Sequence, residues 1–312
     1  MFVPQISRRR QAIPVIAAGA LGLLGACSDS VSPTRPAPSD PTPASLPAAP
    51  SAAVLAGCCN NIVFRRDTIG DIRIATVNAD GTGLVKFSVS GSDPSWSPDH
   101  SKIVFTTGRG ILIMNADGSG LRGLTGVQGD RQPSFTPDGQ KVVFVEDAAK
   151  QSDIVSVNLD GSNRQVLLRT PTAAETSPRF SPDGKKLAYM RTRKNATELV
   201  VLDLTTNIHT VVASPANRFG SESWSPDSKR LAFSAGLFNT TCAIAIVDAN
   251  GANRKNFPSG VNGCFHPTWS SDGTELAFTT PTGLFRGKVD VASPPTRITL
   301  TPNVTDKTPV WQ

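Results

Sequence analysis

The chain has 312 residues, of which 38% are hydrophobic and 18% charged, and its only long apolar run lies near the N-terminus. This composition is too apolar for a disordered chain and excludes a polytopic membrane protein. Arg8, Arg9 and Arg10 supply three of the six net positive charges, so a basic face for nucleic acid is not expected.

Residues 1–26 have the pattern of an export signal. Arg8–Arg10 form a positive start, and Ile13–Leu24 form an apolar stretch too short to span a bilayer. Leu24-Gly25-Ala26-Cys27 resembles a bacterial lipobox, which implies a lipoprotein signal peptide with Cys27 as the lipidated first residue of the mature chain. A simple signal peptide with an incidental cysteine is the alternative.

Residues 27–57 form the next segment, rich in proline, alanine and serine. Seven prolines and almost no large apolar side chains follow Cys27, so this segment has too little apolar surface to offset its ordering entropy. We expect a flexible tether between the lipid and a folded domain. Ser28 stands where some inner-membrane lipoproteins have Asp, which favours the outer membrane and a periplasm-facing location in the cell envelope.

A motif recurs with a period near 40 residues through the rest of the chain. It begins as Pro-Ser-Trp-Ser-Pro-Asp at 94–99, and its later copies keep the aromatic residue and the turn that follows. The aromatic residues are Trp96, Phe135, Phe180, Trp224, Trp269 and Trp311. In each copy a short strand leads through a tight turn into a second strand of the type Ile-Val-Phe.

Each repeat then continues with a third strand, a turn such as Asn78-Ala-Asp80-Gly81 and a fourth strand such as Val85–Val89. Four antiparallel strands per repeat are typical of a propeller blade. The first second-strand copy is Ile62-Val-Phe64, and the last first-strand copy ends at Trp311. We therefore predict an all-β fold, a six-bladed β-propeller over residues 58–312 whose ring closes by pairing the N- and C-terminal strands in one blade.

These repeats resemble the propeller of TolB and its relatives, whose blades carry Pro-x-Trp-Ser-Pro-Asp-Gly-x-x-Ile-Ala-Phe. The resemblance covers residues 61–312. His100 and Ser228 replace the turn glycine, Glu222 replaces the first proline and Ser271 replaces the second. TolB also has a folded α/β domain ahead of its propeller, where this chain has the proline-rich segment. The resemblance therefore does not extend to the partner contacts that TolB makes through its α/β domain.

The carboxylates of the repeated turns are expected to cap the backbone rather than to form a site. They are Asp99, Asp138, Asp183, Asp227 and Asp272.

Four cysteines follow Cys27, in a chain expected to be exported and therefore able to keep disulfides. Cys242 and Cys264 fall in loops that a propeller opens on one face, so a bridge between them is a candidate. Cys58 and Cys59 are adjacent, and three pairings of the four remain open.

Polar residues gather in the loops that lead into the first strands, and we expect them near the mouth of the central channel. Loops on a rigid ring often carry function, so these residues are candidate partner-binding residues; a merely solvated rim is the alternative. They are Asp93, Asp130, Arg131, Gln132, Glu175, Glu222, His266, Asp306 and Lys307.

No nucleophile elbow, phosphate loop or dinucleotide fingerprint occurs in the sequence. This favours a non-enzymatic, lipid-anchored envelope protein that binds a protein or peptidoglycan-associated partner, with no catalytic residues and no cofactor. The main alternative is an enzyme acting on a sugar or lactone at the channel mouth. A Ca²⁺ ion in that enzyme would draw its oxygen ligands from Asp93, Asp130, Glu175, Glu222 and Asp306. A degenerate scaffold that only spaces or sequesters is a third hypothesis.

Replacing the predicted lipidated residue tests the anchor. We expect Cys27→Ala to move the protein from the membrane fraction to the soluble fraction, because no acyl chain can then be attached. Fractionation and immunoblotting measure this, with Ser28→Ala as the control that should stay with the membrane. Equal membrane retention of both variants would refute lipidation at Cys27.

Overall fold

The structure is a computed structural model that describes residues 61–68, 70–148, 151–194, 196–214, 222–235, 244–257, 261, 263–299 and 305–311. The predicted signal peptide, tether, Cys58, Cys59 and Cys242 lie outside these residues. Every regular element of the described part is a β-strand. A helix able to cross a membrane does not occur among the residues that the structure covers.

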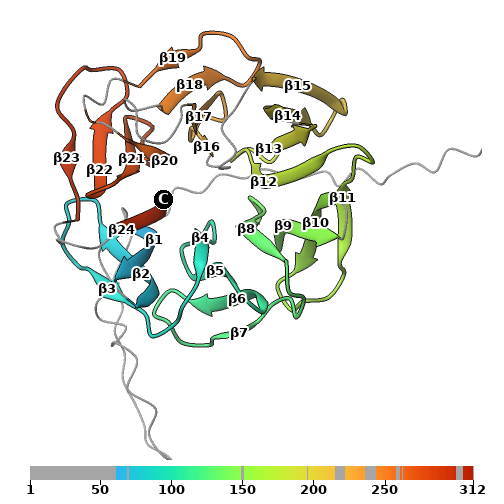
Figure 1. The fold of residues 1–312 in the computed structure, drawn as a ribbon, viewed down its shortest axis with the longest axis horizontal. Coiled ribbons are helices and arrows are strands. Elements are labelled where there is room, and N and C mark those ends of the chain that lie inside the picture. The colour runs from blue at the N-terminus through green and yellow to red at the C-terminus, as the bar shows by residue number, and fades with distance from the viewer. Residues whose placement is uncertain are drawn as a thin grey trace, which may run out of the picture. The chain divides into compact units, whose positions relative to one another are not determined.

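The strands form six four-stranded antiparallel sheets arranged as a ring (Figure 1). We number these sheets as blades 1 to 6 and give the strands of each from the inside outwards. Blade 1 contains β24 (Thr305–Trp311), β1 (Asn61–Thr68), β2 (Asp71–Asn78) and β3 (Val85–Lys86). Blade 2 contains β4 (Ser92–Trp96), β5 (Lys102–Thr107), β6 (Gly110–Asn115) and β7 (Arg122–Gly123). Blade 3 contains β8 (Arg131–Phe135), β9 (Lys141–Ala148), β10 (Gln151–Asn158) and β11 (Gln165–Leu168).

The other three blades repeat this order. Blade 4 contains β12 (Ala174–Phe180), β13 (Lys186–Arg193), β14 (Ala196–Asp203) and β15 (Ile208–Ala213). Blade 5 contains β16 (Ser223–Trp224), β17 (Arg230–Ser234), β18 (Ile244–Asp248) and β19 (Lys255–Asn256). Blade 6 contains β20 (Phe265–Trp269), β21 (Glu275–Thr280), β22 (Gly283–Lys288) and β23 (Thr296–Arg297).

Blade 1 joins the two ends of the propeller. β24 pairs antiparallel with β1, with Ile62 opposite Trp311 and Asp67 opposite Thr305. β1 therefore has neighbours on both sides, and neither of these two strands leaves an open gap in the ring. The predicted six-bladed, all-β propeller with four strands per blade and this mode of closure is confirmed.

The hydrophobic core is divided among the spaces between neighbouring blades. Six buried clusters occur, and each draws residues from two adjacent blades. Between blades 2 and 3, for example, Val104 and Ile111 pack with Phe135 and Phe144, and all four are buried. The Ile-Val-Phe strands supply both faces of each sheet, which explains why their residues are apolar at successive positions.

The repeated turns hold their aspartates as caps, as expected. Asp99 accepts hydrogen bonds from the Ser97 hydroxyl at 2.6 Å and from the Ser101 backbone N–H at 3.0 Å. The Ser97 hydroxyl in turn accepts from the Lys102 N–H. The corresponding contacts recur at Asp138, Asp183, Asp227 and Asp272. The pKa of Asp99 is lowered to about 2, first by the Ser97 hydrogen bond.

The outermost strands are shorter than the sequence suggested. We expected a strand over Val85–Val89, but β3 comprises only Val85–Lys86. Phe87 turns inward instead, is 5% exposed and packs in the core between blades 1 and 2. An outermost strand has one neighbouring strand only, so burial of a single large side chain readily bends it away from regular pairing.

The ring has two faces, which we name by the ends of the inner strands. The mouth face is the one where the inner strands begin, at residues such as Asp93 and Gln132. The turn face is the one where they end and the Ser-Pro-Asp turns follow. Asn61 pairs with Asn78, beside a third-strand turn, and Ile62 lies opposite Trp311. The chain therefore enters β1 at the turn face.

Removing the aromatic side chain of the closing strand should destabilise the whole ring. Trp311 is 5% exposed and packs in the cluster between blades 6 and 1. We expect Trp311→Ala to lower the free energy of unfolding by about 3–5 kcal/mol, the usual cost of truncating a buried aromatic residue. Urea unfolding followed by tryptophan fluorescence and circular dichroism measures this. Val291→Ala, at a side chain 53% exposed, is the control. Equal stabilities would contradict the role of this strand.

Candidate functional site at the channel mouth

In five blades the described residues include one in the left-handed backbone region, within the inner strand and immediately before the motif proline; the equivalent position of blade 5 lies outside the described residues. These residues are Asp93, Gln132, Ser177, His266 and Thr308, with φ between 48° and 54°. In each case the strand pairing shifts register at this point, as at a β-bulge. Five blades thus each place one polar side chain at the same height of the ring, and we call these five residues the mouth ring.

The mouth ring lies at one end of a central cavity of about 390 Å³. All six blades line this cavity, and the motif aromatics Trp96, Phe135, Phe180, Trp224, Trp269 and Trp311 contribute to its wall. Asp93, Gln132, His266 and Thr308 of the mouth ring line it too, together with Glu222, which is 4% exposed. The cavity therefore combines a polar opening with a wall that contains aromatic and proline side chains, a combination suited to binding.

Hydrogen bonds between blades fix the mouth ring. The Gln132 N–H donates to Thr106 Oγ1 of blade 2 at 3.0 Å, and Gln132 Oε1 accepts from the Ser177 N–H of blade 4 at 3.1 Å. On the other side, the His266 N–H donates to Ser234 Oγ of blade 5 at 3.2 Å. These polar side chains are therefore presented by a rigid frame rather than by free loops.

His266 is neutral under physiological conditions. Its ring is partly buried, and desolvation, with a further contribution from the positive charge of Lys307, lowers its pKa from 6.5 to about 4. Its Nδ1 atom is buried and has no hydrogen-bond partner. A neutral imidazole can donate through one ring nitrogen and accept through the other, so His266 adds both kinds of group to the mouth.

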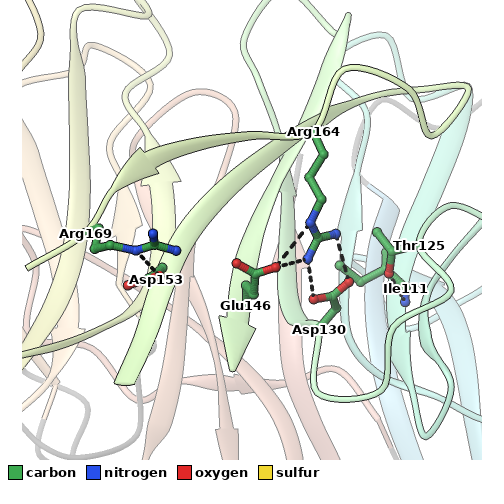
Figure 2. Close-up of polar contacts among 7 residues, drawn as sticks. All are labelled: Ile111, Thr125, Asp130, Glu146, Asp153, Arg164 and Arg169. Atoms are coloured by element: carbon green, nitrogen blue, oxygen red, sulfur yellow. Dashed lines mark hydrogen bonds and ion pairs between the residues drawn. The ribbon is translucent and has the colours of Figure 1, made fainter. Parts of the chain in front are cut away.

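Asp130 is placed away from the cavity, inside an ion-pair cluster of blade 3. Its carboxylate is 0% exposed and contacts the Arg164 guanidinium at 3.0 Å and 3.2 Å. Figure 2 shows Arg164 bridging Asp130 and Glu146, to which it binds at 2.5 Å. The guanidinium also lies over the Phe144 ring, 4.8 Å from its centroid. This geometry gives Asp130 a role in fixing the loop between blades 2 and 3.

Asp306 and Glu175 occupy the same place in their blades as Asp130 and are buried as well. Asp306 lies 3.5 Å from Arg66, and both side chains are 1% exposed. Burial raises the pKa of Asp306, against the lowering effect of Arg66. Burial also raises the pKa of Glu175, and the negative charge of Asp153 adds to this rise. Hydrogen bonds from the side chain and backbone of Thr170 oppose it.

Arg131 and Lys307 complete the set that we predicted from the sequence. Arg131 forms an ion pair with Asp147 at 2.9 Å, and Lys307 forms one with Asp67 at 2.9 Å. Both side chains are partly exposed, Arg131 by 32% and Lys307 by 40%. Within the described residues, no group of three or more His, Cys, Asp or Glu side chains is arranged to hold a metal ion.

The structure thus gathers four of the nine predicted residues, Asp93, Gln132, Glu222 and His266, in the cavity wall. It adds Ser177 and Thr308 to the mouth ring, which we did not predict. The signal for both was present in the repeat, because each stands directly before the motif proline.

Cys264 is buried and disulfide-bonded. Cys242, the other half of the candidate bridge, lies outside the described residues, so that pairing stays a prediction.

Comparisons with known proteins agree with this architecture. A family model described as the TolB β-propeller domain matches residues 160–283. No curated protein matched the chain. Among solved structures, TolB from Acinetobacter baumannii is 18% identical with a TM-score of 0.66, covering 81% of this chain and 66% of that one. This chain therefore spans just under two thirds of that protein.

Two further structures have the same type of fold. A putative TolB from Agrobacterium tumefaciens is 15% identical with a TM-score of 0.59, covering 77% of this chain and 88% of that one. An oligogalacturonate lyase in complex with manganese is 17% identical with a TM-score of 0.51. The match covers 78% of this chain and 74% of the lyase chain. At these identities the likeness establishes the fold. The predicted resemblance to the TolB propeller is thereby confirmed.

The lowered pKa of His266 predicts a pH dependence of stability. Between pH 6.5 and about 4 the unfolded chain binds a proton at this residue that the folded chain does not, so the free energy of unfolding falls as the pH falls. His266→Asn, which tolerates the positive φ, should flatten the curve over this range. Urea titrations at several pH values measure the effect. An imidazole NMR resonance titrating near 6.5 would contradict it.

Proposed function

From this TolB-like propeller with a polar-rimmed central cavity, we propose that the chain is a lipid-anchored binding or scaffold protein of the cell envelope. Its mouth face engages a protein or a peptidoglycan-associated partner. The observation that carries the proposal is the mouth ring, which five blades build with one backbone geometry and five different polar side chains.

The chemical variety of the mouth ring supports recognition rather than packing. Residues that the fold requires recur from blade to blade, as the aromatic and turn residues do. The mouth-ring position instead carries Asp, Gln, Ser, His and Thr. A solvated rim could be built from any repeated polar residue, whereas an irregular arrangement of donors and acceptors on a rigid ring suits a specific ligand surface.

The charges at the mouth also favour a partner on this face. Arg131 and Lys307 beside the mouth, with Asp93 and Glu222 in the cavity wall, offer both signs of charge to that partner.

The test is cross-linking in intact cells, followed by capture of the tagged protein and mass spectrometry. The double variant Asp93→Asn with Glu222→Gln removes two carboxylates and nearly keeps the side-chain shapes. We expect it to reduce recovery of the cross-linked partner at least tenfold, because the lost contacts are charge-assisted hydrogen bonds. The control is Asp290→Asn, at an exposed side chain in the turn between β22 and β23.

Two outcomes would count against the proposal. Equal recovery of the same partner with the double variant would show that the mouth face is not the binding surface. Absence of any reproducible envelope partner, with the protein correctly localised, would remove the support for a binding function altogether.

A further inference from the structure

The outermost strands of the six blades differ in length and in charge, and the proposed function does not involve them. Four outermost strands, β3, β7, β19 and β23, contain two residues each. Each has one exposed basic side chain, namely Lys86, Arg122, Lys255 or Arg297. A very short edge strand with a Lys or Arg is a common means of preventing unwanted strand pairing. Four of the six blades thus have protected edges.

Blades 3 and 4 lack this protection. Their outermost strands, β11 and β15, contain four and six residues and no Lys or Arg. Four apolar side chains on these two strands are well exposed: Val166 by 47%, Leu167 by 42%, Ile208 by 60% and Val211 by 42%. Val212 and Ala213 of β15 are buried. In Figure 1 both strands lie on the outer wall of the ring, away from the central cavity.

β15 is the longer of these two outermost strands and contains no Asp, Glu, Lys or Arg. From Leu204 to Ala213 the chain contains no acidic or basic residue other than His209. The His209 ring is held by Tyr189, whose hydroxyl lies 2.9 Å from Nδ1. Desolvation and the nearby Arg191 and Arg193 lower the pKa of His209, so it is neutral at pH 7. β11, in contrast, is followed directly by Arg169, whose side chain is 52% exposed.

We propose that β15 is a self-association edge, which pairs antiparallel with β15 of a second copy of this chain. Two blades would then form one continuous eight-stranded sheet across a twofold axis. The backbone groups of β15 that face away from β14 would gain partners. Ile208 and Val211 lie three residues apart and therefore on opposite faces of the sheet, so each would pack against side chains of the other copy's β15 on its own face.

Charge argues for a second copy as the occupant. In a twofold antiparallel pairing the residues near the axis lie beside their own copies. A charge near the middle of the strand, or anywhere on a two-residue strand, is therefore brought close to an identical charge, which destabilises the pair. Lys86, Arg122, Lys255 and Arg297 would impose this repulsion at the four short edges. β15 avoids it because its whole length is uncharged at pH 7.

The expected dimer is weak. One six-residue strand from each copy gives a contact at the small end of specific interfaces, so association should depend on concentration. Because β15 lies on the outer wall, pairing leaves the mouth face accessible. Failure of the dimer and failure of partner binding at the mouth are therefore separate results.

The test is sedimentation-velocity ultracentrifugation of the full chain across a range of concentrations, in a Cys27→Ala background so that no lipid drives association. Covalent dimers are removed beforehand. We expect a reversible monomer–dimer equilibrium, and we expect Val211→Lys and Ile208→Lys each to weaken it at least tenfold. The matched control is Val291→Lys, at an apolar side chain 53% exposed on the hairpin of blade 6, which should leave it unchanged.

Hydrogen exchange keeps the proposal testable if a lysine variant fails to fold. In the unsubstituted chain, the outward-facing amides of β15 should exchange more slowly as the concentration rises, and those of β19 should not change. A monomer at every concentration, with no change in exchange at β15, would overturn the proposal. So would a dimer that Leu167→Lys abolishes and Val211→Lys leaves intact, since that result would place the contact at β11.

Discussion

The fold depends on the packing of apolar faces between neighbouring blades. No sheet has a core of its own, because each of the six buried clusters takes residues from one blade and from the next. Two of the four motif tryptophans reinforce this packing by hydrogen bonding: Trp224 and Trp269 donate their Nε1–H groups to backbone carbonyls of the preceding inner strand. A blade is therefore stable only between two others, and closure at β24 and β1 matters to all six.

The same constraint explains why so much of the fold was predictable. Packing between blades requires an aromatic residue on the inner strand and a large apolar residue on the next strand in every repeat, so the sequence repeats these residues in register. Trp96 on the inner strand and Phe105 on the next strand each have an aromatic residue at the equivalent position of every other blade. The burial of Asp130 was not predictable, because its partner Arg164 lies 34 residues away and no repeat marks the pair. The place of Ser177 in the mouth ring, in contrast, could have been predicted, because Ser177 stands directly before the motif proline of its repeat.

The space between blades 3 and 4 departs from the apolar pattern. Its buried cluster is built on Ile154, Leu187, Tyr189, Val200 and Leu202, and charged groups occupy the area around it. Asp153 is fully buried and contacts Arg169 at 2.6 Å (Figure 2), and Glu175 lies nearby. Asp153 is buried but the Arg169 side chain is 52% exposed, so this ion pair lies at the border between the core and the solvent. The two blades with unprotected outer edges therefore meet at a junction that includes charged groups.

The position of β1 inside its sheet has a mechanical consequence. A pull on the chain before Asn61 acts at the turn face and along the axis of β1, which is hydrogen-bonded to β2 on one side and to β24 on the other. Extraction under load would have to shear both ladders at once, whereas an outermost strand such as β3 can be peeled off one bond at a time. β1, an inner member of its sheet, therefore resists extraction better than an outermost strand does.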